Sequence, residues 1–143
     1  MIALSVVAFG CGRKAADPPK ASEVGTARIG WMSDYQQAAA RARELKKPLM
    51  VELMADWCDS CKRLEEEVFS QAEVAAGAGK FVPVKVDGDK QPEIKKQLDV
   101  SGYPTVVFLS VEGKELGRVR GPVPPQLMVK AMEEAAGKAG AGK

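Results

Sequence analysis

The 143-residue sequence contains no histidine. Three kinds of site are thereby excluded: zinc sites built from cysteine and histidine, Ser-His or Cys-His catalytic pairs, and haem ligation by histidine. Aromatic residues make up only 6% of the chain, and no block of lysine or arginine with interleaved aromatics is present, so nucleic acid is not an expected partner. The net charge of +2 points to no particular partner.

What the sequence does contain is enough apolar material for one folded domain. The hydrophobic content of 45% is ordinary for a globular protein, and a chain of this length favours a single domain. There are three cysteines, an odd number. Cys58 and Cys61 form a natural pair, which leaves Cys11 to be explained separately.

The cysteine pair lies in residues 56–62, Asp-Trp-Cys-Asp-Ser-Cys-Lys, after an apolar run that predicts a strand and before a segment that predicts a helix. Two cysteines separated by two residues at such a turn are typical of a redox dithiol. Positions i and i+3 share a helix face, so the sulfurs can form a disulfide or remain two thiols. The first sulfur would lie at the helix N-terminus, where free N–H groups and the helix dipole stabilise a thiolate, the nucleophile in disulfide exchange.

Two other interpretations of the pair remain open. A structural disulfide would close a very small loop and would contribute little chain-entropy stabilisation. A soft metal such as Cu(I) could bind two thiolates, with thioethers added by Met50 and Met54. Core packing already explains both methionines, and we predict no metal site.

The first ten residues, 1–10, predict an export signal. Ile2 to Phe9 is mostly apolar but too short to span a bilayer as a helix, and it leads through Gly10 to Cys11 and a polar, proline-containing stretch. The pattern resembles a bacterial lipoprotein signal, in which Cys11 becomes the lipidated first residue. A plain secretory signal, or an apolar tail with a spare thiol, would also fit. Either export interpretation places the cysteine pair outside the cytoplasm, where disulfides persist.

Three further segments follow from composition. Residues 11–25 are rich in small and polar residues and proline, and we expect them to form a flexible tether. Residues 26–136 form the predicted domain. Residues 137–143 contain only glycine, alanine and lysine, and we expect a disordered tail.

Within the domain, hydrophobic periodicity predicts alternating strands and helices. The expected strands are Arg28–Met32, Leu49–Met54, Phe81–Val86, Thr105–Ser110 and Glu115–Arg120. The expected helices are a first one capped by Ser33 and running to Lys46, then Lys62–Phe69, Gln71–Ala78, Glu93–Leu98 and Gln126–Ala136. This order predicts an α/β fold with a mixed sheet and helices on both faces. Pro83 indicates that its strand lies near an edge or at an irregular pairing, because proline cannot donate to a ladder.

The sequence resembles the thioredoxin superfamily. Residues 55–62, Phe69-Ser70 and Gly102-Tyr103-Pro104-Thr105 are most similar to the C-terminal periplasmic thioredoxin-like domain of DsbD-type thiol reductases. The resemblance implies a thioredoxin fold with a central mixed sheet of four to five strands. The transmembrane domain that supplies electrons in those reductases has no counterpart in this sequence. The central pair Asp59-Ser60 is neither the Gly-Pro of ordinary thioredoxins nor the Pro-His of strong oxidants, which leaves the direction of electron flow open.

The resemblance also implies roles for individual residues. Cys58 would be the exposed attacking thiol and Cys61 the resolving thiol. Pro104 resembles the superfamily's cis-proline, although a trans proline at a strand start is the ordinary alternative. The Tyr103-Pro104-Thr105 segment would pair with an extended substrate segment, and Trp57 would form a flat rim beside Cys58.

Glu52 interrupts the apolar strand Leu49–Met54, six residues before Cys58. It resembles the buried acid of thioredoxins. A carboxyl group in that position should have a raised pKa and could relay a proton for Cys61. The alternative is a glutamate at the sheet rim that reaches water.

The charges beside the cysteine pair favour a reductant. The carboxylates of Asp56 and Asp59 flank Cys58 and should raise the pKa of its thiol, against the opposing effect of Lys62 and the helix dipole. A less stabilised thiolate makes the reduced form less favoured.

We therefore expect a monomeric thiol–disulfide oxidoreductase in the bacterial periplasm, anchored to a membrane by a lipid on Cys11. It would reduce protein disulfides, with a membrane electron donor of the thiol-reductase type restoring its dithiol and no cofactor beyond the Cys58–Cys61 pair. The alternatives are a disulfide oxidant or isomerase, and a non-catalytic thioredoxin-like module that binds a partner or Cu(I).

Overall fold

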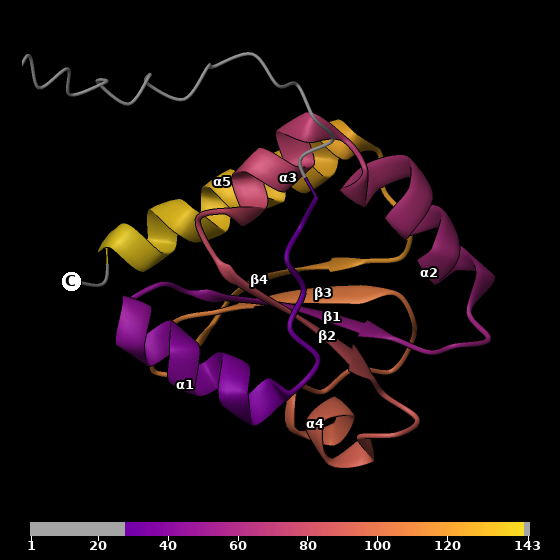
Figure 1. The fold of residues 1–143 in the computed structure, drawn as a ribbon, viewed down its shortest axis with the longest axis horizontal. Helices are drawn as coiled ribbons and strands as arrows, with labels where there is room; N and C mark the ends of the chain where they lie inside the picture. The colour runs from indigo at the N-terminus through magenta and orange to yellow at the C-terminus, as the bar shows by residue number, and fades with distance from the viewer. Residues whose placement is uncertain (1–27, 142–143) are drawn as a thin grey trace, which may run out of the picture.

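The computed structural model describes residues 28–141. The elements in chain order are α1 (Tyr35–Leu45), β1 (Leu49–Met54), α2 (Asp59–Leu64), the π-helix η1 (Glu65–Phe69), α3 (Ala72–Ala78), β2 (Val82–Asp87), α4 (Pro92–Gln97), β3 (Thr105–Leu109), β4 (Glu115–Arg120) and α5 (Pro125–Ala141) (Figure 1). The predicted strands over β1 and β4 are confirmed at both ends. The π-turn after α2 was not anticipated from the sequence.

The described part of the chain contains one four-stranded sheet with the order β2-β1-β3-β4. Strand β1 is parallel to β2 and antiparallel to β3, and β3 is antiparallel to β4. The predicted mixed sheet is therefore confirmed. Pro83 lies on the outermost strand β2, as its missing N–H requires. The parallel register places Glu52 opposite Lys85.

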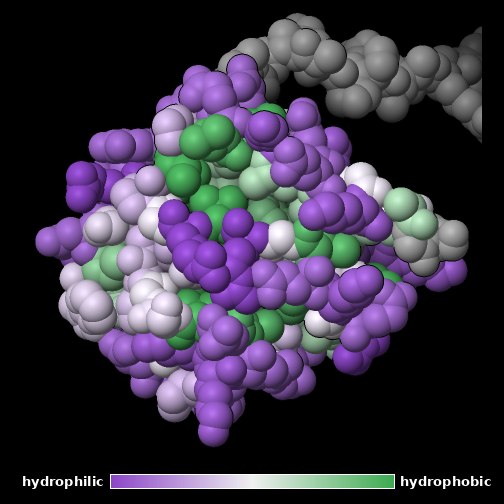
Figure 2. Space-filling model, turned by 180° about the vertical axis from the view of Figure 1, so that it is seen from behind, coloured by the Kyte–Doolittle hydropathy of each residue, from purple (hydrophilic) through white to green (hydrophobic). Residues whose placement is uncertain are grey.

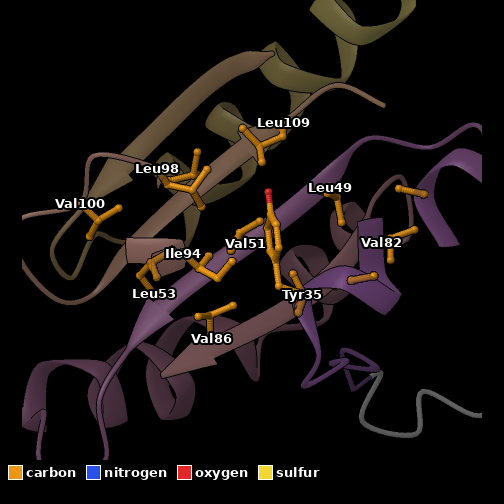
Figure 3. Packing of buried hydrophobic residues seen from close by; sticks show 14 residues of the cluster. Tyr35, Leu49, Val51, Leu53, Val82, Val86, Ile94, Leu98, Val100 and Leu109 are labelled. Carbon is orange, nitrogen blue, oxygen red and sulfur yellow. The ribbon is translucent and has the colours of Figure 1, made fainter. Parts of the chain in front are cut away.

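The two faces of the sheet carry separate apolar cores, because successive side chains of a strand point to opposite faces. Helices α1 and α4 cover one face, where alternate residues of β1 and β2 pack against Tyr35, Ala38, Ala42 and Ile94 (Figure 3). Helices α2, α3 and α5, with η1, cover the other face (Figure 1). Met50 and Phe108, both fully buried, belong to this second core.

Capping explains where α1 begins and ends, and it corrects one expectation. Asp34, not Ser33, is the N-cap: its Oδ1 accepts a hydrogen bond of 2.8 Å from the backbone N–H of Gln37. The helix ends at Lys46, which adopts a left-handed conformation with φ of 53°. Pro48 follows two residues later and prevents continuation.

The predicted strand over residues 28–32 is wrong. Only Met32 pairs with the sheet, through a single parallel bridge to Val84. The N–H of Met32 donates to the Pro83 carbonyl at 2.9 Å, and its own carbonyl accepts from Lys85 N–H at 2.9 Å. The N–H of Trp31 donates instead to the Ile29 carbonyl at 3.0 Å, so the chain turns locally before Met32 and forms no ladder there.

The predicted disordered tail is also wrong over most of its length, because α5 continues to Ala141. Alanine and lysine have high helix propensity, which offsets the cost of Gly137 and Gly140. Tertiary contacts add to this: Lys138 Nζ donates to the Leu116 carbonyl at 3.1 Å, and Ala139 packs against the second core.

Within residues 28–141, no helix combines the length and the apolar character that crossing a bilayer requires. On the face seen in Figure 2, hydrophilic side chains interrupt the exposed apolar areas. Among the described residues, the large apolar side chain with the highest exposure is Trp57, at 68%. It lies next to the cysteine pair, where an exposed aromatic ring points to recognition of a partner.

Candidate active site

The cysteine pair lies where β1 passes into α2. Cys58 is the N-cap of α2, and it forms a disulfide with Cys61 one turn later, with 5.3 Å between the two Cα atoms. The backbone N–H of Cys61 donates to Cys58 Sγ at 3.2 Å. In the reduced protein this hydrogen bond and the helix dipole would favour negative charge on Cys58. The two sulfurs therefore differ: only that of Cys58 caps the helix.

Exposure does not separate the two cysteines, and here the expectation of an exposed Cys58 is wrong. In the disulfide form Cys58 is 5% exposed and Cys61 is 4% exposed. Ala55 forms the buried cluster with the pair, and Met54 and Tyr103 pack against it. Both cysteines are buried because the disulfide lies between the end of β1, which carries Met54 and Ala55, and the loop before β3, which carries Tyr103.

That loop places Tyr103, Pro104 and Thr105 against the pair. The Tyr103–Pro104 peptide bond is cis, which confirms the cis geometry expected at Pro104. Pro104 is buried. Thr105 is 4% exposed, and its Oγ1 donates to the Gly102 carbonyl at 2.8 Å. Tyr103 is half-buried and packs against the cluster that contains both cysteines.

Glu52 is buried beneath the pair, with 1% of its surface exposed. Burial raises its pKa to about 7, the positive charge of Lys85 opposes this, and the negative charge of Glu65 adds to it. Its Oε2 has no hydrogen-bond partner among the described residues. A cavity of about 280 Å³ is lined by Glu52, Cys61, Lys85 and Glu65 among others. The predicted burial and raised pKa are thus found, and the alternative of a glutamate at the sheet rim is excluded.

Lys85 is a member of this site that sequence reasoning missed. Its Nζ lies 2.6 Å from Glu65 Oε2 and 3.9 Å from Glu52 Oε2, and 5.0 Å from the centre of the Trp31 ring. The shorter distance shows that Lys85 is engaged mainly by Glu65, which leaves Glu52 without a close counter-ion. A lysine inside the apolar run Val82–Val86 was the available signal.

Asp89 is a second residue that the sequence did not single out. Its Oδ2 accepts from Trp57 Nε1 at 2.6 Å, and its Oδ1 accepts from the Tyr103 hydroxyl at 3.0 Å. The two rings meet edge to face, with centroids 5.9 Å apart. One carboxylate thus joins the tryptophan beside Cys58 to the residue before the cis-proline.

The charges flanking Cys58 are partly compensated. Lys90 Nζ lies 2.9 Å from Asp56 Oδ2, and Lys62 Nζ lies 3.8 Å from Asp59 Oδ1. Both carboxylates are also well exposed, with side-chain exposures of 70% and 91%. Solvent and these lysines reduce the effect of the two aspartates on the Cys58 thiol.

Two remaining predictions concern a lipid and a metal. Cys11 lies outside the described residues. Among residues 28–141, no group of three or more Cys, Asp or Glu side chains is placed to hold a metal ion.

The fold and the site together define the class of thioredoxin-like disulfide oxidoreductases: a four-stranded mixed sheet, a cysteine pair capping α2 and a cis-proline loop packed against it. A family model described as thioredoxin-like matches residues 30–110. Because this match covers more than half of the chain, the chain belongs to the thioredoxin-like family.

Comparison with individual proteins agrees with this assignment. The chain is 33% identical to the thiol:disulfide interchange protein DsbD of Vibrio vulnificus (strain CMCP6) over 103 residues, which cover 69% of this chain and 17% of that protein. It therefore spans less than a fifth of that relative. A thioredoxin from Thermus thermophilus superposes with a TM-score of 0.72 at 28% identity, covering 80% of this chain and 93% of the other. The reduced C-terminal domain of Neisseria meningitidis DsbD superposes with a TM-score of 0.63 at 20% identity, covering 70% of this chain and 91% of the other. At this identity the similarity shows a shared fold.

Proposed function

We propose that this chain is a thiol–disulfide oxidoreductase that acts outside the cytoplasm and reduces protein disulfides. The observation that carries the proposal is the position of Cys58 Sγ. It caps α2, accepts the Cys61 N–H at 3.2 Å, and is bonded to Cys61 within reach of the Tyr103–Pro104 loop. A sulfur at a helix N-terminus favours the thiolate, which is the attacking species in disulfide exchange.

The reaction follows from the two sulfurs. The Cys58 thiolate attacks one sulfur of the substrate disulfide, a mixed disulfide forms, and the other substrate sulfur leaves as a thiolate that takes up a proton. Cys61 then loses its proton and attacks Cys58 Sγ. The Cys58–Cys61 disulfide forms and the second substrate thiol is released. Two electrons pass from the protein to the substrate, so a dithiol donor must restore the reduced pair.

Glu52 is the proposed acceptor of the Cys61 proton. Both residues line the same cavity. With a pKa of about 7, the carboxyl group of Glu52 is present in both protonation states near neutral pH, which suits proton transfer in either direction. Lys85 and Glu65, which line the same cavity, would set the charge around this step.

The proposed direction is reduction. The residues between the cysteines, Asp59 and Ser60, supply no cation that would stabilise the Cys58 thiolate, and the chain has no histidine to do so. A strong oxidant stabilises its reduced form, whereas a less stabilised thiolate makes the dithiol a better reductant. The ion pair of Lys90 with Asp56 weakens the effect of that carboxylate on the Cys58 thiolate but adds no positive charge beside the sulfur beyond neutralising Asp56.

The reduction potential of the Cys58–Cys61 pair tests the proposal. We expect a value near that of thioredoxin, about −270 mV, after equilibration against dithiol buffers and alkylation of the free thiols. A value near that of the oxidant DsbA, about −120 mV, would reverse the direction and make this a disulfide-forming enzyme. A pair that does not equilibrate at all would overturn the enzyme proposal and favour a binding module.

We further propose a bacterial periplasmic location, anchorage through a lipid on Cys11, and a membrane electron donor of the thiol-reductase type. Support comes from the signal-like residues 1–10 and from the similarity to DsbD, a thiol:disulfide interchange protein by name. A monomer is the simplest state for a site built within one chain.

Replacing Cys11 with serine is expected to abolish lipid attachment. In a bacterial host, the unmodified full chain should incorporate labelled palmitate and sediment with membranes. The Cys11→Ser variant should do neither, because the chain's two other cysteines, Cys58 and Cys61, are bonded to each other. Label on the variant, or none on the unmodified chain, would exclude the anchor.

A further inference from the structure

We propose that Asp89 is a positioning residue that holds Trp57 and Tyr103 together as one aromatic platform for docking protein disulfides beside Cys58. This inference rests on the proposed function and names a determinant of its substrate class. A protein segment that carries a disulfide would lie on the platform, whereas a small disulfide would reach Cys58 without it. The platform is defined as Trp57, Tyr103 and the Asp89 carboxylate between them.

The contacts make Asp89 the shared acceptor. Each of its oxygens takes one donor, Trp57 Nε1 at 2.6 Å and the Tyr103 hydroxyl at 3.0 Å. The hydrogen bond from Trp57 lowers the pKa of Asp89 the most, and that from Tyr103 lowers it further. The carboxylate therefore stays charged at neutral pH. Hydrogen bonds to a charged acceptor are stronger than neutral ones. The two rings are thereby fixed edge to face at 5.9 Å.

The turn that carries Asp89 is itself fixed. Asp87 Oδ1 accepts from the backbone N–H groups of Asp89 at 2.9 Å and Lys90 at 3.2 Å. Gly88 N–H donates to the Met54 carbonyl at 2.9 Å, which ties the turn to the end of β1. A Cβ on Gly88 would fall 2.7 Å from Tyr103 Cε1, so only glycine lets the turn lie flat against that ring.

A second tie joins the same two segments. Lys90, next to Asp89, pairs with Asp56, next to Trp57, at 2.9 Å. On the outer side, Lys95 Nζ lies 4.7 Å from the centre of the Tyr103 ring. An exposed ion pair contributes little alone. Together these contacts explain how a tryptophan that is 68% exposed keeps one orientation.

Fixed, exposed aromatic rings bind partners at low entropic cost, because few rotamers are lost on binding. Trp57 precedes Cys58 in the chain, and Tyr103 packs against the cysteine cluster. An apolar side chain flanking a substrate cysteine would therefore meet the platform when the two disulfides approach. The cysteines of oxidised glutathione are flanked only by γ-glutamate and glycine and carry no apolar neighbour, so their reaction should not depend on the platform.

The test is a pair of single-turnover measurements on the reduced protein, which require no electron donor. The second-order rate constant for oxidation is measured with insulin, as a protein disulfide, and with oxidised glutathione. Asp89→Ala is expected to lower the constant with insulin about tenfold, the scale of one or two lost hydrogen bonds, and to leave that with glutathione within about twofold. Asp89→Asn, which keeps one carbonyl acceptor, should fall between.

Tyr103→Phe separates the platform from general loss of folding, since the ring stays and only the hydroxyl is lost. It should lower the insulin constant about threefold, and adding it to Asp89→Ala should cause no further loss, because the two changes remove the same hydrogen bond. Glu93→Ala is the matched control: it removes an exposed carboxylate four residues away and should change neither constant.

The outcomes are distinct. Selective loss with insulin supports the platform. An equal loss with both substrates would assign Asp89 to the chemistry of Cys58 and overturn the docking role. No loss with either substrate would also overturn the docking role. A wild-type protein that reduces neither substrate would refute the proposed function itself, and the platform with it.

Discussion

Cys58→Ser is expected to lower the rate of disulfide reduction by at least about 10³-fold, to the background of uncatalysed exchange. A serine hydroxyl is not ionised at neutral pH and cannot replace the thiolate that caps α2. Cys61→Ser should behave differently. It keeps the attacking sulfur and loses the resolving one, so the mixed disulfide with the substrate should accumulate. Non-reducing electrophoresis and mass spectrometry of the adduct distinguish the two variants.

Cys11→Ser serves as the background for this experiment, so that each variant carries only one thiol. With the roles as assigned, the adduct forms on Cys58 in the Cys61→Ser protein and is absent from the Cys58→Ser protein. Adducts of equal yield on either cysteine would show that capping of α2 does not select the nucleophile. The reversed pattern would exchange the two roles.

The position of the cysteine pair was accessible from sequence because local rules determine it. An apolar run ends at Ala55, and a helix follows within a few residues. The spacing of Cys58 and Cys61 then places one sulfur at the N-cap and the other one turn later. The family resemblance added what local rules do not contain, the approach of the Tyr103–Pro104 loop, which lies far from the cysteine pair along the chain.

The partners that tune the site were not accessible, because they depend on strand register and on side-chain direction. Lys85 meets Glu52 only because β1 and β2 pair in one particular parallel register. It also meets Glu65, the first residue of the π-helix η1, at 2.6 Å. The role of Asp89 as acceptor for the side chains of Trp57 and Tyr103 has no signature in the sequence.

The errors in the fold have physical causes as well. Residues 28–32 have the composition of a strand, but a local turn, with Trp31 N–H bonded to the Ile29 carbonyl, leaves only one bridge at Met32. The C-terminal residues have the composition of a flexible tail, but the contact of Lys138 with the Leu116 carbonyl and the packing of Ala139 extend α5 over them. Cys58 was expected to be exposed, and packing by Ala55, Met54 and Tyr103 buries it.

Glu52→Gln is expected to stabilise the oxidised protein at alkaline pH and to have a much smaller effect in acid. The pKa of Glu52 rises from 4.5 to about 7 on folding, chiefly because the side chain is buried. Below pH 4.5 the carboxyl group is neutral in both states, and the full stability is present. As the pH rises through 7, the unfolded chain is already ionised and the folded chain must ionise a buried group, so stability is lost.

The gap between the two pKa values corresponds to about 3 kcal/mol of unfolding free energy. Glutamine cannot ionise, so the variant should lack this loss. The loss is measured by urea unfolding of the wild type and Glu52→Gln at pH 4 and pH 8, with Cys58 and Cys61 kept in their disulfide. Any cost of burying the amide is the same at both pH values and cancels in the comparison. Glu93→Gln, on the surface, should keep the wild-type pH dependence.

Identical pH dependence of wild type and Glu52→Gln would contradict the raised pKa and weaken the proton-transfer role. The expected result has a further consequence, because Lys85 is held at 2.6 Å by Glu65 and stays at 3.9 Å from Glu52. The buried carboxyl group then reduces stability at neutral pH without a close ion pair to offset it. Loss of stability at a buried group is typical of residues kept for chemistry. Slower release of substrate by Glu52→Gln in the same pH range would tie that cost to the step at Cys61.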